Sequence, residues 1–321
     1  MKISKLVKRY RVGNSRKFKL TDIDPAETGD LDFDKDDTKA MLAENTKRLA
    51  DLQELLYAQD QWSVLVIFQA MDAAGKDGVI KHVMSGVNPQ GCEVHAFKAP
   101  TAHELDHDFM WRAAVRLPER GHIGIFNRSY YEEVLVVRVH PELLKSQKLP
   151  PELIDDDIWD QRFKTIRAFE RHLCRNGTKI LKFHLRVSKE EQRQRFLDRL
   201  EEPTKRWKFS MGDVAERKLW DKYMDAYQDM IRETSTDDAP WYVIPADNKY
   251  VARLAVSAAV VEAMEELNLS APKVKNSPEL QQVRQALLNE AVGQKNGRNS
   301  RKTARSASSS ALPFERGQGW G

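Results

Sequence analysis

The chain has very little cysteine and no long apolar run. Cys92 and Cys174 are the two thiols among 321 residues, so the fold does not need disulfides, and neither cysteine has neighbouring ligands in a zinc pattern. No stretch approaches the ~20 apolar residues of a membrane span, and the basic N-terminus lacks the apolar segment of a signal peptide. We therefore expect a cytoplasmic protein with no membrane association.

Net charge is also small, and it is unevenly distributed. The chain carries a formal net charge of +4, but from Lys295 onward basic residues outnumber acidic ones six to one. The rest of the chain is therefore close to neutral, and any affinity for anions must come from local clusters. The tail is rich in Ser, Gly, Asn, Arg and Lys. This composition predicts disorder from about residue 293 and a solubilising role rather than nucleic-acid binding.

What the chain does contain is enough apolar sequence for one large α/β domain or two small ones, since 41% of its residues are hydrophobic. Strand-like and helix-like segments alternate, which predicts a parallel sheet with helices on both faces. The expected strands cover residues 64–68, 93–97, 122–126, 180–187 and 241–245. The expected helices cover residues 38–58, 102–117, 151–174, 188–202, 213–234 and 253–267.

These segments divide the chain into three parts. Residues 1–37 look like an extended, irregular arm that ends in an acidic stretch, Asp30–Asp37. Residues 38–270 are expected to form the main domain, with a lid at about residues 188–213. Residues 271–321 are expected to form a C-terminal extension.

The most informative segment runs from Val64 to Gly78 and reads VLVIFQAMDAAGKDG. Its unbroken apolar, β-branched run predicts a buried strand of a parallel sheet. Small residues then lead to Gly75-Lys76, and apolar residues recur beyond them at helical spacing. Strand, small-residue loop, Gly-Lys and helix form a P-loop arrangement, in which backbone N–H groups and a lysine ammonium hold a phosphate. The residues predicted to form this cradle are Ala73, Ala74, Gly75, Lys76, Gly78 and Lys81.

Two departures from the usual G-x-x-x-x-G-K-[ST] pattern are informative. Ala70 stands in place of the first glycine, and Asp77 stands where Ser or Thr normally holds Mg²⁺, while Asp72 adds a carboxylate inside the loop. Two carboxylates should repel a bare polyanion, so we expect a divalent cation near them, with Asp72 and Asp77 as its ligands. The alternative is an ordinary strand–turn–helix with a chance Gly-Lys pair.

Polar residues also follow the strand expected at 122–126. Asn127-Arg128-Ser129 lies where ligands bind in such sheets, at the C-terminal ends of the strands. Asn127 takes the place of the acidic metal partner that usually ends this strand, and Glu132 or Glu133 could also reach the ion. Arg128 could bridge donor and acceptor phosphates with its planar guanidinium. The alternative is a strand-to-helix turn with solvated charges, which suits Glu133 better than Arg128.

A basic segment follows the strand expected at 180–187. We predict that it acts as a lid that closes over phosphates, excludes water and adds positive charge. Its basic residues are Arg195, Arg199, Lys205, Arg206 and Lys208, and Lys182 of the preceding strand is expected to line the same groove. The alternative is a solvated helix whose arginines pair with neighbouring acidic residues, and it is weakened only because a P-loop enzyme needs a lid.

Several motifs along the chain resemble those of the family-2 polyphosphate kinases. They are Ala70–Gly78, Phe126–Glu133, Lys205–Phe209, Asp221–Tyr227, Glu233–Thr236 and Ala239–Pro245. The motifs occur in order and cover roughly residues 38–267. The resemblance implies an α/β, three-layer P-loop kinase fold of the thymidylate-kinase type, with a helical lid.

The resemblance also implies a reaction, namely Mg²⁺-dependent transfer of phosphate between inorganic polyphosphate and a nucleotide, with Mn²⁺ as an alternative ion. Adenine nucleotides are the expected acceptors, with guanine nucleotides as an alternative. The residues implied to be catalytic are Asp72, Lys76, Asp77, Asn127 and Arg128. Asn127 and Tyr131-Glu132-Glu133 look like the subgroup that accepts both AMP and ADP.

Another enzyme class would use the same parts. An ATP-dependent nucleoside monophosphate kinase also needs a P-loop and a lid, so the motifs alone do not separate the two donors. We further expect a homo-oligomer, of an order that the sequence does not fix.

Overall fold

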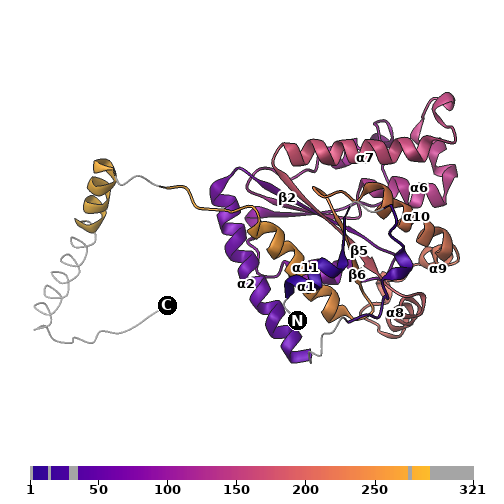
Figure 1. The fold of residues 1–321 in the computed structure, drawn as a ribbon, viewed down its shortest axis with the longest axis horizontal. Helices are drawn as coiled ribbons and strands as arrows, with labels where there is room; N and C mark the ends of the chain where they lie inside the picture. The colour runs from indigo at the N-terminus through magenta and orange to yellow at the C-terminus, as the bar shows by residue number, and fades with distance from the viewer. Residues whose placement is uncertain (1–2, 14–15, 29–34, 274–276, 290–321) are drawn as a thin grey trace, which may run out of the picture. The chain divides into compact units, whose positions relative to one another are not determined.

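The computed structural model describes residues 3–13, 16–28, 35–273 and 277–289 (Figure 1). These residues belong to two units, which divide between Ala271 and Pro272 and are described separately. The first unit holds the sheet and the candidate site, and the second contains a helix over residues 278–289. No helix in the described ranges is long and apolar enough to cross a bilayer.

A six-stranded sheet with the order β1-β6-β5-β2-β4-β3 forms the centre of the first unit. The strands are β1 (Arg11–Val12), β2 (Ser63–Gln69), β3 (Cys92–Ala96), β4 (Ile123–Asn127), β5 (Thr178–Arg186) and β6 (Trp241–Pro245). β2 to β6 pair in parallel, and β1 adds an antiparallel edge on β6. Because Phe68 pairs with both Asn127 and Phe183, the C-terminal ends of β2, β4 and β5 meet at one edge of the sheet.

The central strands are buried on both faces. All seven residues of β2 are buried, as a β-branched run in the middle of a parallel sheet requires. The Phe68 and Phe183 rings stack at a centroid distance of 5.3 Å, and the Phe183 and Tyr242 rings stack at 5.2 Å. These contacts join neighbouring strands close to the ends that carry the candidate site.

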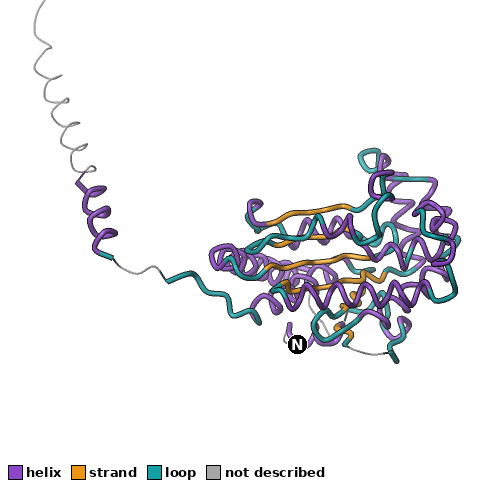
Figure 2. The backbone as a smooth tube through the Cα atoms, turned by 90° about the horizontal axis from the view of Figure 1, so that it is seen from above, coloured by secondary structure: helices purple, strands orange, loops and turns teal. Residues whose placement is uncertain are grey.

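Helices cover both sides of the sheet (Figures 1 and 2). On one side lie α1 (Ile3–Tyr10), α2 (Lys35–Gln59), α3 (Lys76–Val83) and α11 (Lys249–Glu265), which pack on one another. On the other side lie α6 (Val136–Val139), α7 (Ile158–Arg175) and α10 (Trp220–Thr234). Shorter helices complete the unit: α4 (Ala102–Leu105), α5 (Trp111–Ala114), α8 (Lys189–Glu201) and α9 (Met211–Arg217). The predicted parallel sheet with helices on both faces is confirmed.

The predicted strands all occur within two residues of their expected bounds. The helices differ more. The helix expected over 102–117 is two short helices, α4 and α5, because the Asp108 side chain accepts a hydrogen bond from Met110 N (2.9 Å) and forms a turn there. The helix expected from residue 151 begins at Ile158, and the helix expected over 213–234 is divided into α9 and α10.

The prediction of an irregular N-terminal arm is wrong for residues 3–12, which form α1 and β1, whereas residues 16–28 contain turns and one short 3-10 helix, η1 (Leu20–Asp22). Val7 and Tyr10 of α1 are buried, three residues apart, while Lys5, Lys8 and Arg9 are exposed. This amphipathic pattern packs α1 against α11, and β1 then pairs with β6. Basic residues outnumber apolar ones in this segment, so its apolar helix face was not recognised from the sequence.

The chain divides after Ala271, and the C-terminal boundary expected from the sequence lies at residue 270. The disorder predicted from about residue 293 falls outside the described residues. The helix over 278–289 exposes Leu280, Val283, Leu287 and Leu288.

Lys182 does not line a phosphate groove, and that prediction is wrong. Its side chain is 0% exposed, and its Nζ lies 2.6 Å from Glu170 Oε2, donates to Tyr131 Oη at 3.0 Å and donates to Thr234 O at 2.8 Å. Burial lowers the pKa of Lys182, while the Glu170 carboxylate opposes that shift. Tyr130 and Tyr131 both donate hydrogen bonds to Glu170 Oε1. Lys182 is therefore the centre of a buried polar network between β5, α7 and the turn that follows β4.

Replacing Lys182 by Met should destabilise the protein, because it leaves the Glu170 carboxylate buried without its cation. We expect the free energy of unfolding to fall by about 3–5 kcal/mol, measured by urea denaturation. The double change Lys182→Met with Glu170→Gln should recover part of that loss, since no uncompensated charge then remains. A Lys182→Met variant with normal stability but weakened affinity for polyphosphate would instead restore the groove assignment.

Candidate functional site

The loop between β2 and α3 has the backbone shape of a phosphate cradle. Ala73 and Gly75 both adopt left-handed conformations, with φ of +60° and +107°. Gly75 is the residue before α3, and its carbonyl accepts the first helical bond, from Val79 N (3.0 Å). The free N–H groups of the first turn of α3 therefore face the loop, where an anion is favoured by the helix dipole.

Lys76 folds back over the end of β2. Its Nζ donates a hydrogen bond to Ala70 O at 2.8 Å and lies 3.4 Å from Met71 O. Burial, and then the nearby Arg128 charge, lower the pKa of Lys76 to about 8, although neighbouring carboxylates oppose the shift. The acceptors that the ammonium contacts are carbonyl oxygens rather than a carboxylate, so it can turn to an incoming phosphate.

Arg128 joins the ends of β2 and β4 through two ion pairs. Its Nη2 lies 2.5 Å from Asp72 Oδ1, and its Nη1 lies 3.2 Å from Glu132 Oε2. These two carboxylates, Glu132 first, raise the pKa of Arg128 above its ordinary value. The residue has a φ of +64°, so the backbone turns sharply as it leaves β4 and aims the side chain across the edge of the sheet.

Asn127 and Asp77 join β4 to the start of α3. Asn127 Nδ2 donates a hydrogen bond to Asp77 Oδ1 at 2.8 Å. An aspartate at position 127 would instead place two carboxylates against each other, so the amide explains how Asp77 fits beside this strand end.

The structure adds a third wall, from α9 and α10, which the sequence analysis missed. Tyr223 and Tyr227, four residues apart on α10, line a pocket together with Asp72, Arg128 and Glu132. The signal in the sequence was the i, i+4 spacing of the two tyrosines, but nothing in that spacing points to Asp72.

Asp213, in the first turn of α9, lies near the same charged groups. Burial, and then the Asp72 charge, raise the pKa of Asp213, while Arg199, Arg128 and Lys76 oppose the shift. Asp213 therefore lies within electrostatic reach of the main charged groups of the site.

Arg195 was predicted to be a lid cation, but its Nε donates to Glu191 Oε1 (2.8 Å) and both of its Nη groups donate to the backbone. Its Nη1 donates to Ala73 O (3.1 Å) and Ala74 O (2.8 Å). Its Nη2 donates to Ala246 O (2.6 Å) and Asp247 O (3.0 Å). Arg195 thus holds the phosphate loop against the segment after β6, and the structure does not support direct phosphate binding by this side chain.

The other predicted basic residues pair with acidic side chains or are exposed to solvent. Arg199 Nη1 lies 3.8 Å from Asp213 Oδ2, and Lys205 pairs with Glu202. Arg206 and Lys208 are exposed in the turn between α8 and α9, and Lys81 is exposed on α3. Trp207, between Arg206 and Lys208, is 78% exposed, so the turn from α8 to α9 presents cations and an aromatic ring to solvent.

The carboxylates of the site do not form a metal cage by themselves. In the described part of the chain, no three His, Cys, Asp or Glu side chains gather as a set of metal ligands. Mg²⁺ typically binds through one or two carboxylates, with water and substrate phosphates completing its octahedral shell. The carboxylates of Asp72 and Asp77 fit that incomplete type of site.

Comparison with known proteins places the chain in a family. Residues 32–272 match the model of the family described as polyphosphate kinase 2. The chain belongs to the polyphosphate kinase 2 family. The resemblance inferred from the sequence motifs is thus confirmed, and so is the P-loop kinase fold that it implied.

Two curated relatives match nearly their whole length. An ADP-polyphosphate phosphotransferase of Rhodopseudomonas palustris is 53% identical over 288 residues, covering 88% of this chain and 98% of the relative. An AMP/ADP-polyphosphate phosphotransferase of Meiothermus ruber is 47% identical over 273 residues, covering 85% and 98%. The crystal structure of polyphosphate kinase 2 from Arthrobacter aurescens TC1 superposes with a TM-score of 0.80 at 41% identity, covering 89% of this chain and 96% of that one.

Replacing Arg195 by Ala should loosen the phosphate loop, because four backbone carbonyls lose their donor. We expect the free energy of unfolding to fall by about 2–3 kcal/mol. We also expect kcat/KM to fall about 10–100-fold from misplacement of the loop. Arg193→Ala is the matched control, since Arg193 lies on the same helix and pairs with exposed Glu190. Unchanged stability with a higher, salt-dependent KM for polyphosphate would show that Arg195 binds phosphate after all.

Replacing Lys76 by Ala should remove most of the turnover while the protein stays folded. We expect kcat to fall by about 10²–10³-fold, because a charge positioned for the transition state is lost. Lys179→Ala is the control, since Lys179 lies at the N-terminal end of β5, away from the site at the C-terminal ends of the strands, and pairs with Glu266. Near-normal turnover in Lys76→Ala would contradict the assignment.

The lowered pKa of Lys76 predicts a pH dependence with a definite sign. The ammonium is charged below its pKa of about 8, so kcat/KM should decline as the pH rises through that value. In Lys76→Arg the guanidinium stays charged, so that decline should disappear whatever the absolute rate. A wild-type profile that is flat from about pH 7 to 9.5 would be inconsistent with this role.

Proposed function

We propose that this chain transfers phosphate between inorganic polyphosphate and adenine nucleotides, converting AMP to ADP and ADP to ATP. The observation that carries the proposal is the convergence of Lys76, Arg128 and Asp72 at the adjoining ends of β2 and β4. A P-loop lysine and a bridging arginine are suited to hold two phosphate groups next to each other.

The names of the relatives support the donor and the acceptors. Both curated relatives are named as polyphosphate phosphotransferases, one of them for ADP and the other for AMP and ADP. The two names differ in the acceptor, so acceptance of both AMP and ADP is the finer part of the proposal. Asn127 and the Tyr131-Glu132-Glu133 sequence support it.

The proposed reaction needs little covalent chemistry from the protein. An anionic oxygen of the nucleotide's terminal phosphate attacks the end phosphorus of the polyphosphate chain. The bond from that phosphorus to the next bridging oxygen breaks, and the chain leaves one phosphate shorter. The attacking oxygen is already anionic, so no general base is required, and Lys76 and Arg128 hold the developing negative charge.

We also propose that Mg²⁺, or Mn²⁺ in its place, is required. The carboxylates of Asp72 and Asp77 would hold the ion together with substrate phosphates and water, and it would supply neutralisation of phosphate charge. Asp213 is a third carboxylate within electrostatic reach of Asp72.

A cytoplasmic location is likewise a proposal, supported by the two free thiols, Cys92 and Cys174. The homo-oligomer expected from the sequence stays a prediction.

The decisive assay supplies AMP and polyphosphate without ATP, and follows ADP and ATP over time. We expect ADP to appear first and ATP later, with both lost on adding a chelator and restored by excess Mg²⁺ or Mn²⁺. ATP formed from ADP with no product from AMP would reduce the proposal to an ADP-specific enzyme. Product formation that requires ATP as the donor would replace it with an ATP-dependent nucleoside monophosphate kinase.

A further inference from the structure

A carboxylate on α9 joins three segments of the chain beside the phosphate site. Glu216 Oε2 accepts a hydrogen bond from Tyr223 Oη of α10 at 2.6 Å, and His140 Nε2 lies 2.9 Å from the same oxygen. His140 stands between α6 and the 3-10 helix η4 (Pro141–Gln147). One oxygen atom of Glu216 therefore links the turn after α6 to both α9 and α10 (Figure 1).

Both ring nitrogens of His140 face carboxylates. Nε2 contacts Glu216, and Nδ1 lies 3.3 Å from Glu142 Oε1. A neutral imidazole has one N–H donor, whereas the imidazolium has a donor on each nitrogen, so the cation is the form that satisfies both contacts. The hydrogen bond to Glu216 accordingly raises the pKa of His140 above its ordinary value, although burial opposes the shift.

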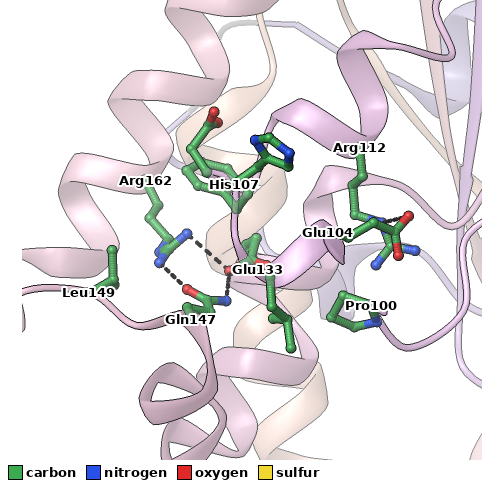
Figure 3. Close-up of a pocket in the computed structure, with 11 residues that line it drawn as sticks. Pro100, Glu104, His107, Arg112, Glu133, Gln147, Leu149 and Arg162 are labelled. Atoms are coloured by element: carbon green, nitrogen blue, oxygen red, sulfur yellow. Dashed lines mark hydrogen bonds and ion pairs between the residues drawn. The ribbon is translucent and has the colours of Figure 1, made fainter. Parts of the chain in front are cut away.

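The segment that carries His140 is held on both sides. Before it, two of the four residues of α6 are buried. After it, η4 ends at Gln147, whose Nε2 donates to Glu133 Oε2 at 2.8 Å, while Arg162 Nη1 lies 3.0 Å from the same oxygen (Figure 3). Glu133, Gln147 and Arg162 line one wall of a pocket at that point. His140 is therefore placed by the body of the domain.

Glu216, in contrast, lies on a helix with little apolar packing. All seven residues of α9 are exposed or half-buried. Such an element depends on polar contacts for its position, because little apolar surface holds it in place. Arg217 Nη1 provides one such contact by donating to Gln192 Oε1 at 2.9 Å, and the pair of His140 with Glu216 provides another.

The carboxylate of Glu216 also borders the phosphate site. It lines the pocket that contains three charged residues of that site: Asp72, Arg128 and Glu132. The charged lining residues are thus three carboxylates and one guanidinium, and this excess of negative charge disfavours phosphate. Arg128 already pairs with both Asp72 and Glu132. The cation that faces Glu216 is His140.

We propose that His140 is a positioning residue for phosphate transfer, which acts through Glu216. As an imidazolium it holds Glu216 in place beside Tyr223, and it cancels the negative charge that Glu216 would otherwise present to substrate phosphates. His140 itself touches neither the substrate nor the reacting atoms in this role. The inference rests on the proposed function, since it concerns how the site of that reaction tolerates a polyanion.

The kinetic test is a double-mutant cycle of His140→Gln and Glu216→Gln. Glutamine at position 140 keeps a hydrogen-bond donor for Glu216 but not the charge, so the carboxylate is left uncompensated. We expect kcat/KM for polyphosphate to fall about tenfold, mainly through a higher KM. Adding Glu216→Gln removes the uncompensated charge and should bring kcat/KM back to within about threefold of wild type.

A matched histidine at the other end of the sheet supplies the control. His122 precedes β4 at the end opposite to Asn127, and its Nδ1 lies 2.9 Å from a backbone oxygen, Arg120 O. His122→Gln should therefore keep the wild-type kcat/KM. Glu216→Gln alone should also stay within about threefold of wild type, because it removes the charge rather than uncovering it, and this variant keeps the test decisive if His140→Gln fails to fold.

An NMR titration of the imidazole of His140 measures the ion pair without turnover. Its pKa should lie above the ordinary value of about 6.5, so the pair is complete at low pH and is lost as the pH rises through the raised pKa. Glu216→Gln should lower that pKa. Glu142→Gln should lower it less, because the side chain of Glu142 is 65% exposed.

The outcomes separate this inference from the proposed function. Absence of polyphosphate-dependent transfer by the wild type would remove the proposed function, whatever the titration of His140 shows. Normal transfer with a double variant no better than His140→Gln would overturn the inference alone, because the pair would then act only through structure. Wild-type kcat/KM in His140→Gln, or a pKa of His140 that Glu216→Gln leaves unchanged, would also overturn it.

Discussion

The buried ion pair between Lys182 and Glu170 supports the 3-10 turn η3 (Tyr130–Val134), which carries Glu132 and Glu133. It is an unusual element of a core, because two desolvated charges are tolerated only when their remaining hydrogen bonds are satisfied. Here they are, since both tyrosines of η3 donate to Glu170, and Lys182 also donates to a backbone carbonyl. The ion pair therefore holds η3 in place through its two tyrosines, and the conformation of η3 sets the directions of Glu132 and Glu133.

A second constraint acts from the opposite side of the phosphate loop. Arg195 binds carbonyls of two loops that are far apart in the sequence, next to a residue with positive φ. A loop of small residues has few side-chain contacts of its own, so its shape depends on such external donors. Phosphate recognition in this chain thus relies on an arginine that need not touch phosphate.

The sequence was sufficient to predict the strands of the sheet and the part of the site formed by Lys76 and Arg128. Runs such as Val64–Phe68 are apolar throughout, and only a strand buried on both faces accounts for them, so their bounds were predictable. The Gly75-Lys76 motif and the position of Arg128 at the end of β4 followed from the same pattern, because ligands collect where parallel strands end.

The failures have a common physical cause. A lysine in a strand suggests an exposed face, and the buried partner of Lys182 lies on a different element, so its burial could not be inferred from spacing. Arg195 was placed correctly on a helix face, but the loop carbonyls it binds have no signature in the sequence. The pocket lined by Glu133 and Arg162 draws on four separate segments, which only tertiary packing brings together (Figure 3).

The arrangement of η3 also bears on how the chain can change over evolutionary time. Glu132 and Glu133 contact different arginines, Arg128 and Arg162, so a substitution of either glutamate alters one of these contacts at a time. An insertion or deletion of one residue would rotate every later side chain by a third of a turn and move Glu133 out of its pocket. The number of residues between Arg128 and Val134 therefore decides whether Glu132 and Glu133 can both keep their contacts.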